Sequence, residues 1–306
     1  MTPRMTHESK GMWLGLLGVV IFAMTLPMTR LAVGSALDPQ LPPLFITAGR
    51  AAVAGLLSIA YLVLTGAPRP ARHQWATLAV CAAGTVVGFP LFLALALRDV
   101  DAMHAAVITG VLPLGTALAA AASFRQRPSN GFWACAVAGC ALVLAFALHQ
   151  GSGRLSAADG LLLLAVASAS IGYVAGARLS ARMSAEQVIC WVLVLSLPLT
   201  APVMWASWPE QPVRASAWAG FAYVTLFSMW LGFFAWYRGL ALGGTVRVSQ
   251  VQLVQPFLAL LFAVPLLGER LEPATVGFSL AVIATVFIGK KMPTDLSPSP
   301  RNITRP

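Results

Sequence analysis

The stretch VQLVQPFLALLFAVPLLGERLEP, residues 251–273, decides how the rest of the chain is interpreted. It is almost entirely apolar, and a helix needs about 20 such residues to cross a bilayer. Yet it contains Gln252, Gln255 and Pro256, and it ends in a Gly-Glu-Arg turn. Polar side chains and internal prolines are costly in lipid. The stretch therefore predicts a membrane-spanning helix with one polar face, and not a plain anchor.

The composition of the whole chain agrees with a membrane protein. Of 306 residues, 58% are hydrophobic and only 10% are charged, whereas about 25% are charged in a typical soluble domain. The net charge of +10 would suggest nucleic acid as a partner of a soluble protein. Here the basic residues lie between apolar runs, so the membrane explains them better. We expect an all-α integral membrane protein that binds no nucleic acid.

The four cysteines all lie inside apolar runs and form no CxxC pair. This spacing is unlike that of a disulfide framework or a metal site, so we expect small packing residues, no metal and no cofactor. No sequence feature calls for an obligatory protein partner. The expected partners are the lipid bilayer and a small-molecule metabolite.

Ten apolar runs have the length of a transmembrane helix. They lie near residues 12–33, 42–65, 75–97, 102–124, 131–149, 158–180, 185–206, 216–240, 245–267 and 273–290. Most of the 20 Lys and Arg residues lie in the two tails and in every second connection. Because basic residues gather on the cytoplasmic side, both termini should be cytoplasmic. We expect a multi-pass protein of the cell (inner or plasma) membrane.

The two halves of the chain resemble each other. A shift of 143 residues pairs Thr85 with Ser228, Thr109 with Gln252, Pro113 with Pro256 and Arg127 with Arg270. Five spans in each half would insert the halves in opposite directions, an arrangement that carriers use for alternating access around a site at the midplane. The expected architecture is ten transmembrane helices as two inverted five-helix repeats around a central cavity. The predicted division is 1–11 as an N-terminal tail, 12–150 and 151–290 as the repeats, and 291–306 as a C-terminal tail.

The C-terminal stretch QLVQPFLALLFAVPLLGERLEPATVGFSLAVIATVFIG, residues 252–289, resembles the closing repeat of EamA-type proteins of the drug/metabolite transporter superfamily. The shared features are the mid-span proline, the Gly-Glu-Arg turn and the proline that opens the last helix. Arg50, in FITAGRAAVAG, matches the single arginine of the second span in that family. The resemblance implies ten helices, inverted repeats and a central cavity for small metabolites. One branch, the YddG-type exporters, carries aromatic and neutral amino acids.

One face of the ninth run carries Ser249, Gln252 and Pro256 at helical spacing, with Gln255 at its edge. We interpret this face as lining a substrate cavity, and helix–helix hydrogen bonding is the alternative. The fourth run carries a matching face with Thr109, Pro113 and Thr116, which the repeat places across the pseudo-two-fold axis. This match favours the cavity, with Thr109 and Pro113 as further lining candidates. The two mid-span prolines either free a backbone carbonyl or bend their helices.

Other cavity candidates lie on the third, sixth and eighth runs. They are Thr85, Tyr173, Ser228 and Trp230. Thr85 and Ser228 align across the repeat, whereas Tyr173 and Trp230 offer aromatic surface for an apolar or aromatic substrate. Anchoring at the membrane interface is the alternative for aromatic residues.

Charged groups are the candidates for gating. Arg50 either snorkels to the nearer interface, pairs with a carboxylate on the outer side, or binds a substrate carboxylate. Glu269 is expected to pair with Arg50 or Arg98 in one access state, with a solvated turn as the alternative. His104 lies about one turn inside the fourth run. No Asp or Glu lies in the middle of a run, which predicts facilitated or weakly coupled transport.

The leading functional hypothesis is a secondary carrier of small organic solutes, in particular an amino-acid exporter. A membrane-embedded enzyme is the second hypothesis, because GFSL at 277–280 fits the GxSx pattern of intramembrane serine proteases, although no histidine follows Ser279. An ion channel is the third, although the sequence shows neither charged rings nor a carbonyl filter loop.

Overall fold

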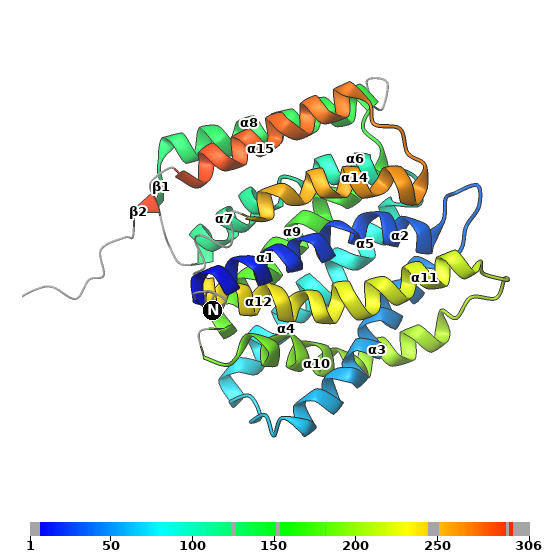
Figure 1. The fold of residues 1–306 in the computed structure, drawn as a ribbon, viewed down its shortest axis with the longest axis vertical. Coiled ribbons are helices and arrows are strands. Elements are labelled where there is room, and N and C mark those ends of the chain that lie inside the picture. Colours follow the sequence, from blue (N-terminus) through cyan, green and yellow to red (C-terminus); the bar gives the residue numbers. More distant parts are fainter. Residues whose placement is uncertain are drawn as a thin grey trace, which may run out of the picture.

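The computed structural model describes residues 7–123, 127–150, 154–180, 182–243, 251–291 and 294–295. Figure 1 shows a bundle of helices that run roughly alongside one another. The regular elements are helical except for two strands of two residues each, β1 (Arg127–Pro128) and β2 (Thr294–Asp295), which pair antiparallel. The expectation of an all-α protein is thus confirmed.

The first half of the chain forms a series of helices, several of them interrupted. They are α1 (His7–Ala23), α2 (Thr25–Val33), α3 (Pro43–Leu64), the 3-10 turn η1 (Arg72–Gln74), α4 (Trp75–Cys81), the π-helical η2 (Ala82–Gly88), α5 (Phe89–Ala96), α6 (Ala102–Thr109), α7 (Leu112–Ser123) and α8 (Asn130–Gln150). The pairs α1–α2, α4–α5 and α6–α7 each form one long apolar segment.

The second half repeats this pattern of long and interrupted helices. Its elements are α9 (Ala157–Ser180), α10 (Ala185–Ala206), α11 (Ala215–Tyr223), the π-helical η3 (Val224–Leu231), α12 (Gly232–Gly243), the 3-10 turn η4 (Gln252–Val254), α14 (Gln255–Leu267) and α15 (Pro273–Lys291). The α11–η3–α12 segment, like α4–η2–α5, has a π-helical centre.

Eight segments among the described residues are long and apolar enough to cross a membrane. Two shorter apolar helices, Gln252–Leu267 and Pro273–Gly289, fall where the ninth and tenth spans are expected. Wherever these ten segments are described, their ends agree with the expected runs to within a few residues. The structure therefore supports a multi-pass membrane protein, and the count of ten spans stays a prediction.

The two mid-span prolines open helices and do not bend them from within. Pro113 is the second residue of α7, after a turn at 110–111 that ends α6. Pro256 is the second residue of α14, after the 3-10 turn η4. A proline in the first turn loses no intrahelical hydrogen bond, because the N–H at that position has no partner inside the helix. Each proline thus fixes the point at which an interrupted segment resumes.

The centre of the bundle is held by close contacts between long segments. The most extensive contacts join α3 with α10, α1 with α12, α8 with α15, and α9 with α5, η2 and α7. Glycines permit the closest of these approaches: a Cβ on Gly172 of α9 would lie 2.6 Å from Thr85 Cγ2, and one on Gly239 of α12 would lie 2.6 Å from the backbone nitrogen of Gly15. Small residues play this role in membrane bundles generally.

Candidate functional site

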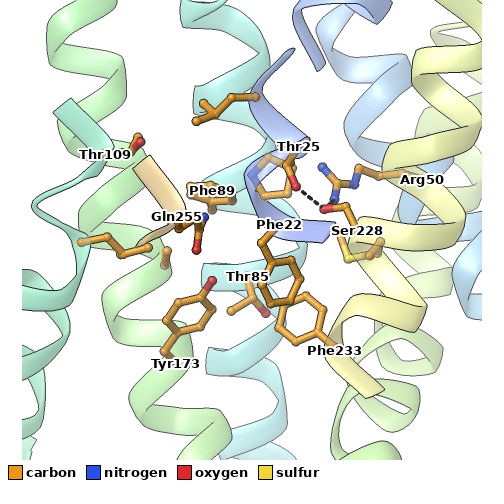
Figure 2. Close-up of a pocket in the computed structure, with 15 residues that line it drawn as sticks. Phe22, Thr25, Arg50, Thr85, Phe89, Thr109, Tyr173, Ser228, Phe233 and Gln255 are labelled. Carbon is orange, nitrogen blue, oxygen red and sulfur yellow. Dashed lines mark hydrogen bonds between the residues drawn. The ribbon is translucent and has the colours of Figure 1, made fainter. Parts of the chain in front are cut away.

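A small enclosed cavity lies in the middle of the bundle, where several interrupted segments meet (Figure 2). Its lining residues are Phe22, Thr25, Leu26, Arg50, Thr85, Phe89, Pro90, Thr109, Leu112, Ala169, Tyr173, Ser228, Met229, Phe233 and Gln255. The cavity volume, counted as the space that the centre of a water molecule can reach, is about 50 Å³. By that measure one water needs about 10–15 Å³, so the cavity has room for a few water molecules.

The interruptions of the helices bring polar side chains to this cavity. Thr85 lies in η2 and Ser228 in η3, and both are buried. Thr25 is the first residue of α2, next to the break at Met24, and Thr109 is the last residue of α6. Such π-turns and breaks are frequent at functional sites, because they change the direction in which side chains point.

Arg50 is the only charged residue among the described residues that line the cavity. It lies two turns into α3, on the same face as the fully buried Ile46 and Ala54, and its side chain is 3% exposed. Its Nη2 donates a hydrogen bond of 3.0 Å to the hydroxyl of Ser228, and that hydroxyl lies 2.8 Å from the hydroxyl of Thr25. Arg50 Nε and Nη1 are buried and have no partner in the described part of the chain.

The wall opposite Arg50 carries Gln255, Tyr173 and Thr109 (Figure 2). Gln255 Oε1 is buried and has no hydrogen-bond partner among the described residues. The hydroxyl of Thr109 donates to the backbone carbonyl of Ala105 at 2.7 Å, within its own helix. The apolar part of the lining includes Phe22, Phe89 and Phe233.

The structure brings together five of the ten residues expected to line a cavity. Thr85, Thr109, Tyr173, Ser228 and Gln255 line the cavity, and Arg50, expected to gate or pair charges, joins them.

The other expected residues lie elsewhere. Pro113, Gln252 and Pro256 lie beside the cavity in the interrupted segments but are not among its lining residues, and Ser249 lies outside the described residues. The indole nitrogen of Trp230 donates to the hydroxyl of Ser58 at 3.1 Å.

Arg50 fits neither of the two alternatives to substrate binding, which were snorkelling to the interface and pairing with a carboxylate. It does not snorkel, because its side chain extends from the buried face of α3 toward the bundle centre. Within the described residues no carboxylate lies within ion-pair distance of it, so it forms no charge pair in this conformation.

Sequence reasoning missed Thr25 and the three phenylalanines of the lining. The only sequence signal for Thr25 is a threonine two residues before Pro27 in the first apolar run.

A polar cluster closes the end of the bundle formed by the connections 34–42, 97–101, 154–156, 207–214 and 268–272, which we call the Glu269 end. Both carboxylate oxygens of Glu269 accept hydrogen bonds of 2.8 Å, one from the backbone N–H of Ala102 and one from that of Met103. These groups belong to the first turn of α6, where N–H donors are unsatisfied and the helix dipole favours a negative charge. Partial burial nevertheless raises the pKa of Glu269, against the lowering effect of these bonds.

The Glu269 carboxylate therefore does not pair with Arg50 or Arg98 in this conformation, as had been expected for one access state. It is also more than a solvated turn, because it ties the α14–α15 connection to α6. Gly268 ends α14 in the left-handed conformation, with φ of 69°, which directs the chain toward α6.

In the described part of the chain the Glu269 end also holds two ion pairs, Arg30 with Asp101 and Arg214 with Asp38, and a hydrogen bond between His104 and Asp159. His104 Nε2 lies 2.6 Å from a carboxylate oxygen of Asp159, and Arg30 Nη2 lies 3.6 Å from Asp101. Arg30 also donates to the backbone carbonyl of Leu97. His104 thus has a partner on α9, at the end of the bundle and away from the cavity.

The serine of the GFSL pattern belongs to no catalytic group among the described residues. Ser279 is 1% exposed, and its hydroxyl has no hydrogen-bond partner there. A serine nucleophile needs a base within hydrogen-bond reach. The ring of His149 packs on Phe278, the neighbour of Ser279, with centroids 6.1 Å apart, but it makes no hydrogen bond to Ser279 in the described part of the chain.

A polytopic helical bundle with a small polar cavity at its centre is the architecture of a membrane carrier. The chain belongs to the EamA-like transporter family, whose family model matches residues 9–148 and again residues 156–289. The members of this family are transporters, and the chain is not an enzyme.

Two curated relatives cover almost the whole chain. An uncharacterized transporter YdeK of Bacillus subtilis (strain 168) is 42% identical over 289 residues, which are 94% of this chain and 99% of the relative. A probable terminal-alkyne amino-acid exporter of Streptantibioticus cattleyicolor is 27% identical over 303 residues, covering 92% of this chain and 94% of the relative. One solved crystal structure covers 92% of this chain and 96% of its own, with a TM-score of 0.63 and 18% identity, which supports the fold alone.

Proposed function

We propose that the protein is a secondary transporter of small organic metabolites that exports amino acids by alternating access. The central cavity carries this proposal, because it is enclosed within the bundle and has one charged, one polar and one apolar surface. An amino acid presents a carboxylate, an ammonium group and a side chain, which can use all three. The distant relative described as a probable terminal-alkyne amino-acid exporter supports the same substrate class.

The proposed architecture is ten transmembrane helices as two inverted five-helix repeats, over 12–150 and 151–290, with tails at 1–11 and 291–306. Its support is the pairing of equivalent elements. The π-helical η2 and η3 occupy equivalent places, 143 residues apart at Thr85 and Ser228. The contact of α1 with α12 corresponds to that of α9 with η2 and α5, while α3–α10 and α8–α15 each join equivalent helices of the two repeats.

The proposed location is the cell membrane, with both termini in the cytoplasm and the Glu269 end outside. The distribution of basic residues supports this orientation. A reporter fused after Pro306 should then show a cytoplasmic location, and a cysteine introduced at Arg154 should react with an impermeant reagent from outside. The opposite labelling would show that the protein is inserted the other way round.

The present cavity has room for a few waters but not for a whole amino acid, so transport requires a wider conformation. We expect purified protein in liposomes to exchange internal for external labelled neutral amino acids with saturable kinetics. Flux that rises linearly with concentration would favour a channel, and no exchange of any neutral amino acid would contradict the substrate class.

A further inference from the structure

We propose that Arg50 is the anchor for a carboxylate of the transported molecule, and that Gln255 accepts a hydrogen bond from its other polar end. This inference rests on the proposed function and assigns the substrate chemistry of its central cavity. The two residues lie on opposite walls of one cavity, and each has buried polar atoms with no partner among the described residues.

The first step concerns the unbalanced charge. A buried charge is costly unless another charge or several hydrogen bonds compensate it, and arginines inside membrane proteins normally pair. Arg50 is 3% exposed, and its one hydrogen bond to another described residue is to Ser228. None of the described residues that line the cavity is acidic. The charge of Arg50 is therefore left for something that enters the cavity.

The second step concerns geometry. The bond from Nη2 to Ser228, together with the contact of Ser228 with Thr25, holds the guanidinium at the cavity wall. Among the described residues Nη1 has no partner, and Nη2 uses only one of its two hydrogens, for Ser228, so the Nη1–Nη2 face stays available. A guanidinium presents its donors in a planar fork that matches the two oxygens of a carboxylate. The arrangement therefore fits a carboxylate better than a single-atom anion such as chloride.

The third step concerns the opposite wall. Gln255 Oε1 is a buried acceptor that has no partner in the described part of the chain, and Tyr173 lines the same cavity. A donor on the ligand, such as an ammonium group, would satisfy it. Phe22, Phe89 and Phe233 provide apolar surface around these polar groups. The complementary ligand is thus a small molecule with a carboxylate, a nearby donor and an apolar side chain.

The test uses three probes of similar shape on the purified, full-length protein: L-leucine, L-leucinamide, which lacks the carboxylate, and 4-methylpentanoate, which lacks the ammonium group. A ligand that binds the folded state raises the melting temperature with its concentration. We expect stabilisation by L-leucine, weaker stabilisation by 4-methylpentanoate, and none by L-leucinamide. Charge-assisted hydrogen bonds of this kind correspond to roughly 10- to 100-fold in affinity, so Arg50→Gln should weaken L-leucine binding by about that factor.

Two further variants make the test decisive. Thr47→Val changes a buried residue one turn earlier on α3 that does not line the cavity, so it should bind L-leucine like the wild type. If Arg50→Gln does not fold, Arg50→Lys keeps the charge, loses the planar fork and should bind more weakly while still rejecting L-leucinamide.

Each outcome separates the anchor from the wider proposal. Equal stabilisation by L-leucine and L-leucinamide, or unchanged L-leucine affinity in Arg50→Gln, overturns the carboxylate anchor and leaves an amino-acid carrier standing. Stabilisation by 4-methylpentanoate but not by L-leucine supports the anchor and overturns amino acids as the substrate class. If neither carboxylate stabilises the wild type, the anchor is wrong.

Discussion

At the scale of single residues, the hydroxyl of Ser228 connects three segments around the cavity. It accepts from Arg50 Nη2 on α3 at 3.0 Å and bonds to the hydroxyl of Thr25 on α2 at 2.8 Å, from its own place in η3. A serine hydroxyl has one hydrogen to donate and two lone pairs to accept, so it can serve both partners at once. The position of the Arg50 guanidinium thus depends on Ser228.

Replacing Ser228 with alanine should therefore destabilise the protein. The change leaves a buried Arg50 donor and the Thr25 hydroxyl without a partner, which costs about 1–3 kcal/mol in the free energy of unfolding. The matched control is Ser196→Ala in α10, a buried serine whose hydroxyl, among the described residues, bonds only to the backbone carbonyl of Val192 in its own helix. Unfolding in detergent would measure both, and equal losses would show that the link between segments contributes nothing.

Glu269 gives a prediction of pH dependence. Burial raises its pKa above the ordinary value of 4.5, so the folded protein holds this proton at a pH where the unfolded chain has released it. Stability from this group is then present below 4.5 and lost as the pH rises through the folded pKa. The wild type should lose melting temperature over this window, relative to Glu269→Gln, which has no proton to lose.

The matched control for the pH series is Glu272→Gln, which removes an exposed carboxylate from the same connection. The effect assigned to Glu269 is the change with pH that exceeds the change seen with this control. A difference between the wild type and Glu269→Gln that stays constant with pH would mean that the carboxylate titrates alike in the folded and unfolded chains.

At the scale of elements, hydrophobic run length predicted where helices begin and end, because apolar length is what the bilayer requires. It did not predict the π-helical turns of η2 and η3, which carry Thr85 and Ser228. A π-turn arises where tertiary packing favours a wider turn, and no residue pattern marks it. The alignment of the two halves identified both residues, but it did not reveal the π-helical conformation in which they lie.

The ninth run shows why the candidate site could be predicted only in part. A constant period of 3.6 residues placed Gln252 on the inward face and Gln255 at its edge. The structure has a 3-10 turn over Gln252–Val254, with 3.0 residues per turn. This turn shifts the directions of the preceding side chains around the helix axis, relative to those that follow. Gln255 faces the cavity as a result. Phase shifts of this kind depend on backbone geometry that composition does not reveal.

Helix packing gives a prediction at the same scale. A Cβ added to Gly172 of α9 would lie 2.6 Å from Thr85 Cγ2 and 2.9 Å from the backbone nitrogen of Thr85. Gly172→Ala should therefore force α9 away from η2 and cost about 1–3 kcal/mol. Gly160→Ala in the same helix meets nothing within 4 Å, so its better helix propensity should make it neutral or stabilising by up to about 1 kcal/mol. Melting temperatures that fall equally for both would contradict the close contact.

At the scale of the whole molecule, several polar contacts join the connections at the Glu269 end. Arg30 joins Asp101, Arg214 joins Asp38 at 2.5 Å, and Glu269 joins the first turn of α6. Alternating access requires these contacts to part when the cavity opens toward that end. Arg214 and Asp38 are more than half exposed, and exposed pairs contribute only about 0–1 kcal/mol each. Under the proposed alternating access, several weak contacts would suit a gate that opens repeatedly at this end.

A disulfide across this gate tests whether it moves. The backbone N–H of Ala36, in the 34–42 connection, donates to the carbonyl of Arg98 at 2.9 Å. Residues bonded in this way have Cα atoms close enough for a disulfide, which requires about 4.4–6.8 Å. Cysteines at both positions, in a variant whose four native cysteines are replaced by alanine, should cross-link spontaneously or with a mild oxidant.

The cross-linked protein should lose exchange of the transported amino acid in liposomes and regain it on reduction, because the Glu269 end can no longer open. Each single cysteine variant controls for the loss of the Ala36 or Arg98 side chain and should be insensitive to oxidant. Binding gives an independent readout, since a cavity still reachable from the other end should keep its affinity for L-leucine while exchange stops. Full exchange in a completely cross-linked sample would mean that the gate lies elsewhere and that this end stays shut throughout the cycle.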